Sequence, residues 1–329
     1  MSLCYVSKIL KKFLLAVFVL VIALSGAIGL LSMRAGYGVL YFPTMYKGLV
    51  KDFLFRAYGP KTVSAHTFVG LYTKIALKSL VLPQKDVNQE HMLGYDISFF
   101  DKVTFFCGYS EIFVKEIYHF KTAKEDPFII DCGSNIGLTI LYFKMLYPKA
   151  EVIAFEPSQK CFNVLQKNVA DNHLTNVTAY NKAVSDREGK NSFWDPSHGR
   201  GDGRASILVQ GQNKDMTETE CVHLSNYISK PVDLLKMDIE GAEFGVFQEL
   251  AQANKLGLIK EIVLEYHHHV PNGDIDRLGQ FLALLESNNF GYQIRGCNIG
   301  IGYQFDAKEV QLINLHAYNK NFMRANSSH

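Results

Sequence analysis

The sequence has few cysteines, and none of them lies in a Cys-x-x-Cys pair. Six cysteines stand singly along the 329 residues, at positions 4, 107, 132, 161, 221 and 297. A disulfide framework or a zinc site is therefore not expected. We interpret them as scattered core thiols, which favours a domain that faces the cytosol. Two triplets, 176–178 and 326–328, match the glycosylation sequon, but such triplets arise by chance and decide nothing without knowledge of the compartment.

The sequence also lacks an excess of charge of either sign and any visible internal repeat. The 34 Lys and Arg residues against 32 Asp and Glu residues give a net charge of +2. That balance leaves no basic surplus for a phosphate footprint, so nucleic acid is not expected as the main partner. With 48% hydrophobic and 20% charged residues, the composition is that of an ordinary folded chain.

One long uncharged run lies near the N-terminus. Residues 13–33 carry no charge and follow a short basic tail, 1–12, so they predict a transmembrane helix or signal anchor and a single-pass membrane location. A cleaved signal peptide is the alternative, although the run is long for one. Lysine and arginine on both flanks leave open which side of the membrane the rest of the chain would occupy. The aromatic-rich residues 34–90 predict a linker of short helices.

The stretch 128–141, FIIDCGSNIGLTIL, has the strongest local pattern in the chain. An apolar strand runs into Asp131, a tight turn lies between Gly133 and Gly137, and an apolar helical pattern follows. A strand, a glycine turn and a helix in this order present backbone N–H groups and a helix N-terminus to a ligand.

The turn differs from a dinucleotide-binding fingerprint in two respects. Asn135 replaces its middle glycine, and Asp131 lies two residues before the first glycine. A carboxylate there would repel a pyrophosphate but suits a cationic ammonium or sulfonium. Glu156 ends a second strand pattern, EVIAFEP, where an acid can accept both ribose hydroxyls of NAD or S-adenosylmethionine. The combination favours S-adenosylmethionine.

Several motifs now occur in a characteristic order: DCGSNIG, AFEP, NKAVSD, LLKMDIEGAE and IVLEYH, preceded by EIFVKEIYHF at 111–120. Together they resemble the FkbM family of S-adenosylmethionine-dependent methyltransferases over residues 91–318. The resemblance implies an α/β fold, doubly wound around a mostly parallel seven-stranded sheet of the Rossmann-like class I methyltransferase type. Alternating strand and helix patterns from residue 128 onward agree with it. The tail 319–329 is expected to fray.

The resemblance also implies a set of cofactor-binding residues. Asp131 would balance the methionine ammonium, directly or through water, and Glu156 would hold the ribose. Asp186 resembles the family acid that accepts from the adenine amino group, although a turn aspartate explains it equally well. The cofactor set is Asp131, Gly133, Ser134, Asn135, Gly137, Glu156, Pro157 and Asp186.

The acceptor side is expected at the ends of two further strands. Residues 232–238 predict a strand ending in Asp238, and 259–266 predict one followed by three histidines. We assign catalytic roles to Asp238 and His267, with His267 as general base because an imidazole titrates near neutral pH. A divalent ion held by Asp238, Glu240, Glu265 and His267 is a less favoured alternative, and no metal is predicted.

The remaining segments complete the expected fold. Residues 187–230 predict an inserted hairpin above the carboxyl ends of the sheet, with strands at 205–211 and 221–228. His198, Arg200 and Arg204 in it are more simply read as a solvated loop than as acceptor contacts. A third strand is expected at 177–184, a helix at 275–289, and a final antiparallel pair around Tyr292 and at 310–318.

These observations predict a methyltransferase that O-methylates a hydroxyl of a glycan, lipid or secondary metabolite by in-line displacement. Two alternatives remain at this point. A membrane-tethered, non-catalytic binding protein on the same fold would bind the ligand without turnover. A NAD-dependent oxidoreductase would need a pyrophosphate turn, which Asn135 and Asp131 disfavour.

Overall fold

The computed structural model describes residues 86–100, 102–195, 216–268, 277–296 and 311–325. No helix within these ranges is both long and apolar enough to cross a membrane. The expected anchor at 13–33 lies outside the described residues, and so do His198, Arg200, Arg204 and the strand predicted at 205–211.

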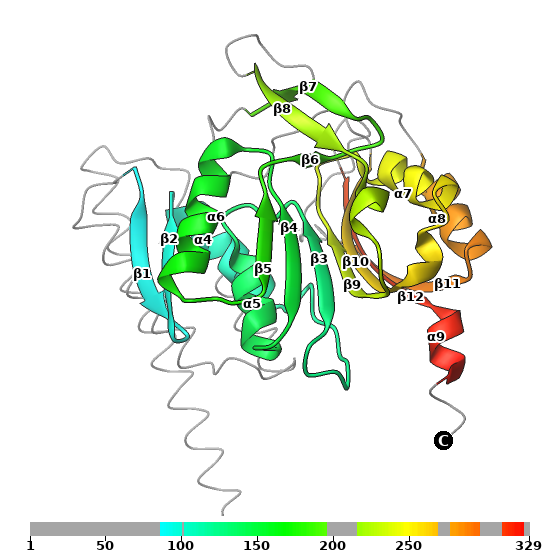
Figure 1. The fold of residues 1–329 in the computed structure, drawn as a ribbon, viewed down its shortest axis with the longest axis horizontal. Coiled ribbons are helices and arrows are strands. Elements are labelled where there is room, and N and C mark those ends of the chain that lie inside the picture. The colour runs from blue at the N-terminus through cyan, green and yellow to red at the C-terminus, as the bar shows by residue number, and fades with distance from the viewer. Residues whose placement is uncertain (1–85, 101, 196–215, 269–276, 297–310, 326–329) are drawn as a thin grey trace, which may run out of the picture. The chain divides into compact units, whose positions relative to one another are not determined.

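A seven-stranded sheet forms the centre of the fold, in the order β11-β12-β10-β9-β3-β4-β5 (Figure 1). The first five strands along the chain pair in parallel, and the last two are antiparallel. The expected Rossmann-like sheet and its final antiparallel pair are therefore confirmed. The strands are β3 (Phe128–Cys132), β4 (Glu151–Phe155), β5 (Val177–Tyr180), β9 (Val232–Met237), β10 (Ile259–His268), β11 (Phe290–Gly296) and β12 (Gln311–Asn319).

Every residue of β3 and of β9 is buried, as expected of central strands in a sheet with both faces covered. Figure 1 shows one group of helices at the β3–β5 half of the sheet and a second group at the β9–β12 half. The first group is α4 (Lys102–Tyr109), the π-helical turn η1 (Ser110–Val114), α5 (Leu138–Leu146) and α6 (Gln159–Asp171); the second is α7 (Glu243–Gln252) and α8 (Leu278–Ser287).

An antiparallel hairpin of β1 (Asn88–Met92) and β2 (Tyr95–Phe99) precedes the sheet. The hairpin begins at Asn88, inside the predicted linker. Asn168 of α6 fixes the hairpin, because its side-chain amide donates to Ser98 O at 3.0 Å and to Ile136 O at 2.8 Å. Since Ile136 belongs to the glycine turn, one buried asparagine connects the hairpin, α6 and that turn.

The expected strand at 177–184 is divided between two sheets, so that prediction was wrong. β5 ends at Tyr180, and β6 (Ala183–Val184) pairs with β8 (Met216–Val222), which also pairs with β7 (Gly189–Trp194). Asn181 causes the break, because its side chain donates to the carbonyls of Glu156 and Pro157 at 2.8 and 3.0 Å. The small sheet lies beyond the carboxyl ends of β3, β4 and β5, where the insertion was expected (Figure 1).

Three expected element ends also differ. The strand predicted at 221–228 ends at Val222, and a 3₁₀ turn, η3 (Leu224–Tyr227), follows. β10 extends to His268, beyond the predicted end at Tyr266. Asn319 is not frayed: it is fully buried, its side chain donates to Ile259 O at 3.1 Å, and α9 (Lys320–Ala325) follows it.

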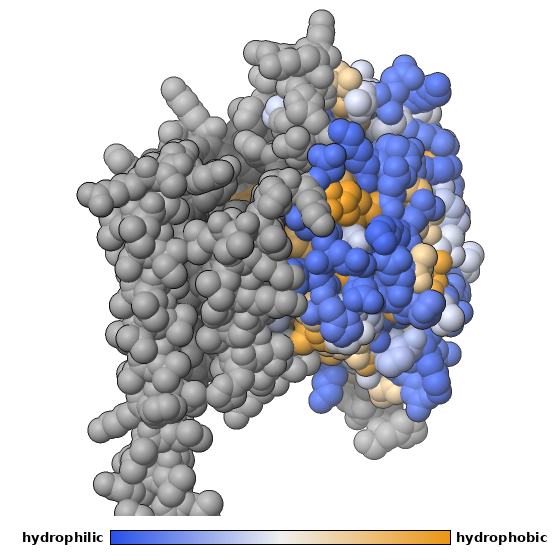
Figure 2. Space-filling view, turned by 90° about the vertical axis from the view of Figure 1, so that its left-hand side faces the viewer, coloured by the Kyte–Doolittle hydropathy of each residue, from blue (hydrophilic) through white to orange (hydrophobic). Residues whose placement is uncertain are grey.

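The surface of the described residues offers little apolar area. Their only exposed large hydrophobic side chains are Val87 before β1, Ile294 in β11 and Met323 in α9. The coloured part of the face in Figure 2 is mainly hydrophilic, with apolar side chains in small groups. Most apolar side chains are instead buried in the core around the central sheet.

Candidate active site

The turn after β3 packs directly against the end of β9. Gly133, Asn135 and Gly137 have φ angles of 77°, 49° and 85°, a region that glycine adopts without steric cost. A Cβ atom on Gly133 would lie 1.8 Å from the carbonyl oxygen of Asp238, and the Asp238 N–H donates to Cys132 O at 3.1 Å. Glycine is therefore required at position 133 by its conformation and by the close approach of another backbone.

The N–H groups of this turn are used within the protein, which corrects the expectation that they face a ligand. Those of Gly133 and Ser134 both donate to Phe155 O at 3.0 Å, and that of Gly137 donates to Ser134 O at 2.8 Å. The Asn135 N–H donates to Glu156 Oε2 at 2.8 Å. The turn is thus fixed against the end of β4, and what it offers a ligand is close approach to its backbone.

Asp131 also departs from its expected place, because it does not line the ligand cavity. It is fully buried, its Oδ1 lies 3.2 Å from Lys236 Nζ, and its Oδ2 accepts from the Thr139 hydroxyl. Lys236 in turn donates to Gly133 O at 2.7 Å and to Cys132 O at 3.2 Å. Asp131 therefore acts behind the turn as the counter-ion of a buried lysine.

A cavity of about 210 Å³ lies beside the glycine turn. Gly133, Ser134 and Asn135 line one side of it, together with Asp238 at the end of β9. Much of the remaining lining belongs to the 111–120 segment and the helix before it. Its walls there include Phe105, Glu111, Ile112 and Tyr118.

Glu156 lies at the end of β4, as predicted, but outside the lining of this cavity. It is buried, and its two oxygens accept from the N–H groups of Asn135 and Ser158, each at 2.8 Å. Burial raises the pKa of Glu156 to about 7, against the opposing effect of these two hydrogen bonds. The carboxylate thus holds the turn and would be stabilised by further donors such as hydroxyl groups.

Three other predicted cofactor residues lie outside the cavity lining. Asp186 is exposed; a Cβ on Gly245 of α7 would lie 2.9 Å from its carboxyl group, and its Oδ1 accepts from the Ser185 hydroxyl at 3.2 Å. This placement fits the alternative of a turn aspartate better than an adenine contact. Pro157 contributes its carbonyl to Asn181, and Gly137 packs against Leu165.

Asp238 is the predicted acid that does face the cavity. The buried hydroxyl of Tyr118 donates to Asp238 Oδ2 at 3.1 Å. Burial raises the pKa of Tyr118 well above 10, and the nearby charge of Asp238 adds to that effect. The phenol therefore remains a hydrogen-bond donor at neutral pH and holds one oxygen of Asp238 in place.

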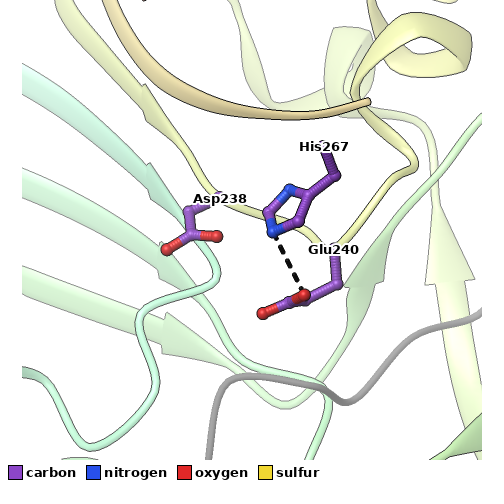
Figure 3. Close-up of side chains that lie close together, drawn as sticks. All are labelled: Asp238, Glu240 and His267. Carbon is purple, nitrogen blue, oxygen red and sulfur yellow. Dashed lines mark ion pairs between the residues drawn. The ribbon is translucent and has the colours of Figure 1, made fainter. Parts of the chain in front are cut away.

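His267 projects from β10 toward Asp238 and Glu240, as Figure 3 shows. Its Nε2 lies 3.1 Å from Glu240 Oε2, and its Nδ1 lies 2.9 Å from Glu243 Oε1. Burial alone would lower the pKa of His267, but these two carboxylates raise it well above 6.5. With both nitrogens donating to carboxylates, His267 is an imidazolium, and this geometry does not suit the expected general base.

The same side chains were also considered as metal ligands. One ligand atom each from Asp238, Glu240 and His267 lies within 4.8 Å of the others. His267 Nε2 and Glu240 Oε2 lie 3.1 Å apart, and we describe this group as an ion-paired cluster.

A protein-family comparison matches the model of the methyltransferase FkbM domain to residues 131–294. The chain is 32% identical to methyltransferase sdnD of Sordaria araneosa over 216 residues. This aligned region covers 55% of this chain and 80% of that protein. The chain belongs to the FkbM family of methyltransferases. It is an enzyme, and S-adenosylmethionine is its methyl donor. The two alternatives, a binding protein and a NAD-dependent oxidoreductase, are set aside.

Two further relatives are named for O-methylation. The 31-O-demethyl-FK506 methyltransferase FkbM of Streptomyces tacrolimicus is 28% identical, over 55% of this chain and 80% of that protein. The 2-O-methyltransferase NoeI of Sinorhizobium fredii is 30% identical, over 37% of this chain and 57% of that protein.

The residues of this FkbM-family enzyme fit the methyl donor. Apolar and aromatic walls beside two carboxylates, those of Asp238 and Glu111, suit a molecule that combines an apolar thioether chain with positive charge. The buried carboxylate of Glu156 suits a pair of hydroxyl groups. Asp238 therefore takes the ligand-facing place that was expected of Asp131.

Sequence reasoning missed three residues of the site: Tyr118, Lys236 and Glu243. Lys236 had a visible signal, because it is the only cation in the apolar strand VDLLKM, and a charge buried there needs a partner. Tyr118 lies in the 111–120 segment that carries the family resemblance. Glu243 had no signal beyond its place at the end of the KMDIEGAE motif.

Gly133→Ala tests the contact between the turn and β9, with Gly189→Ala as a matched control. Both glycines have positive φ, but a Cβ at 189 meets no atom within 4 Å. We expect Gly189→Ala to lower the free energy of unfolding by about 1–2 kcal/mol and to leave S-adenosylmethionine binding unchanged. Gly133→Ala should cost about 3 kcal/mol or more, because the Asp238 backbone must move.

Urea unfolding and calorimetric titration measure these two effects. Equal losses in the two variants, with S-adenosylmethionine binding intact in both, would show that the predicted clash is absent.

Proposed function

We propose that this enzyme transfers the methyl group of S-adenosylmethionine to a hydroxyl group of a glycan, lipid or secondary metabolite. The observation that carries the proposal is the position of Asp238. Its carboxylate lies on the cavity, beside the glycine turn, and is held by the Tyr118 hydroxyl. The two relatives named for O-methylation support oxygen as the acceptor atom.

S-adenosylmethionine supplies an electrophilic methyl group on a positively charged sulfonium. The protein has to align an acceptor oxygen with that methyl group, which is worth about 7–11 kcal/mol in favourable cases. It must also accept one proton from the acceptor. We assign the proton to Asp238, because its carboxylate lines the cavity and one of its oxygens is held by Tyr118.

His267, the other predicted catalytic residue, takes a different role in this proposal. As an imidazolium between Glu240 and Glu243, it neutralises part of the negative charge near Asp238. It therefore contributes electrostatically and does not take the proton itself. On the cofactor side, we assign the ribose hydroxyls to Glu156 and close backbone approach to residues 133–137, with Asp131 acting through Lys236.

The function is tested by incubating the full-length chain with methyl-labelled S-adenosylmethionine and a panel of glycan, lipid and polyketide hydroxyl acceptors. Label should appear as an ether that is stable to mild base. Asp238→Asn should lower kcat about 100-fold or more, the range of general-base catalysis. It should change the Kd for S-adenosylmethionine by only a few-fold.

Asp171→Asn at the end of α6 is the control, since that acid pairs with Lys167 outside the cavity lining. Full turnover by the Asp238→Asn variant would remove Asp238 as the proton acceptor. Label found only on nitrogen or carbon would contradict O-methylation.

The raised pKa of Glu156 predicts a pH dependence of cofactor binding. In the free protein this pKa is about 7, and hydroxyl donors would favour the ionised form. The affinity for S-adenosylmethionine should therefore rise with pH and level off above about 7. Near pH 6, binding should release a proton from Glu156 to the buffer. Calorimetry in buffers of different ionisation enthalpy measures this release, and Glu156→Gln should abolish the release.

Without ligand, the raised pKa of Glu156 should make the folded protein less stable as the pH rises, whereas it makes cofactor binding tighter. Unfolded Glu156 ionises near 4.5 and the folded residue near 7, so the free energy of unfolding should fall as the pH rises between these values. An unchanged binding profile in Glu156→Gln would contradict the assignment to the ribose.

We also propose that residues 13–33 anchor the enzyme in a membrane as a single-pass helix. The uncharged run is the support for this proposal. Full-length protein should stay in the membrane pellet after carbonate extraction, whereas a chain lacking residues 1–33 should not. Release of the full-length protein, or a mature form that begins beyond residue 33, would contradict the anchor.

A further inference from the structure

Glu243, the first residue of α7, holds the turn that follows β9. It is fully buried, and its Oε1 accepts from the N–H of Ile239 at 3.3 Å and from that of Gly241 at 3.1 Å. A carboxylate at this position also interacts favourably with the N-terminal end of the helix dipole. One oxygen thus satisfies two backbone donors of the segment that links Asp238 to α7.

That segment needs to be held, because its backbone is strained. Glu240 has a φ of 56°, in the left-handed region, and Gly241 has a φ of 104°. A non-glycine residue in such a conformation costs about 1–3 kcal/mol and persists only when its surroundings fix it. The conformation turns the Glu240 side chain toward His267 (Figure 3).

The same oxygen of Glu243 also holds His267. His267 Nδ1 lies 2.9 Å from Glu243 Oε1, and His267 Nε2 lies 3.1 Å from Glu240 Oε2. Glu243 therefore connects three elements at a single atom: the turn after β9, the start of α7 and the end of β10. Asp238 stands at the beginning of this turn, so its position depends on the same contacts.

We propose that Glu243 is a positioning residue for methyl transfer: its Oε1 fixes the 238–241 turn and His267 together and so sets the place of the Asp238 carboxylate. The assignment rests on the proposed role of Asp238. Glu243 does not line the cavity and touches no reacting atom in this scheme. It acts through Asp238 and His267.

The charge around His267 supplies a readout that a general loss of packing would not give. The groups that face it are Glu240 from the turn, Glu243 from α7 and Glu265 of β10, whose Oε1 lies 3.9 Å from Nε2. Asp238 also faces it, with a carboxylate oxygen within 4.8 Å of the imidazole. Removing the charge of Glu243 while keeping its shape should make His267 easier to deprotonate. An unrelated weakening of α7 would leave those carboxylates in place.

The test compares full-length Glu243→Gln with full-length Glu249→Gln. Glu249 is a matched control, because it is also a buried carboxylate of α7 that accepts a backbone N–H, that of Ser225 at 3.4 Å. The protein is labelled uniformly with ¹⁵N, and the His267 ring signals are identified by their absence in His267→Gln. Ring titration, amide exchange at Ile239 and Gly241, binding of S-adenosylmethionine and turnover are then measured.

In Glu243→Gln we expect the pKa of His267 to fall by about one unit or more, a tenfold change in proton affinity. The Ile239 and Gly241 amides should exchange faster. The kcat should fall about tenfold to a hundredfold, with the KM for S-adenosylmethionine within about threefold, as for residues that orient a catalytic group. Glu249→Gln should change none of these.

Glu243→Asp provides a second test if the glutamine variant does not fold. It keeps the charge but is one methylene shorter, so exchange at Ile239 and Gly241 should still increase. Unchanged His267 titration and kcat in Glu243→Gln would overturn the proposal, as would identical effects in Glu249→Gln. If the wild type transfers the methyl group to nitrogen or carbon, the proposal of O-methylation is wrong. The measurements on the Glu243 variants would still test the positioning role of Glu243.

Discussion

The buried ion pair between Asp131 and Lys236 connects most parts of this active site. The two residues are direct neighbours in the parallel pairing of β3 with β9, and both are buried. Removing one partner of such a pair leaves an uncompensated buried charge, typically at a cost of about 3–5 kcal/mol. The lysine also donates to the carbonyls of Cys132 and Gly133, and its Nζ lies 5.2 Å from the centre of the Tyr118 ring. The glycine turn and the segment that covers the cavity therefore both depend on one charge pair.

The position of that pair follows from the topology of the sheet. The chain runs from β3 outward through β4 to β5, and then returns to place β9 on the other side of β3. Ligands in open α/β sheets bind where the strand order reverses, at the carboxyl ends of the strands. Gly133 follows β3 and Asp238 follows β9, so both lie at this point. Their contact is so close that the side chain of any residue but glycine at 133 would meet the Asp238 carbonyl.

The sequence predicted the fold well because its strands and helices have strong local patterns. The strands expected beside Asp131, Glu156, Asp238 and His267 are present and end at Cys132, Phe155, Met237 and His268. The sequence did not predict which acid faces the ligand. Asp131 and Lys236 are separated by more than a hundred positions, and no local pattern shows that they pair. Similarly, the turn N–H groups were expected to be free because the sequence does not show that Phe155 O and Glu156 receive them.

The role of His267 also differs from the predicted one, because the sequence does not show which acids contact it. This difference bears on which residue we propose as the general base. Two carboxylates, those of Glu240 and Glu243, contact this one imidazole and hold it in its charged form. Burial and the charge of Asp238 raise the pKa of Glu265 to about 8, so Glu265 carries a proton at neutral pH. Tyr118, Glu265 and His267 all hold protons near pH 7, so none of these three is the acceptor in our proposal. The proposed acceptor, Asp238, lines the cavity beside the glycine turn.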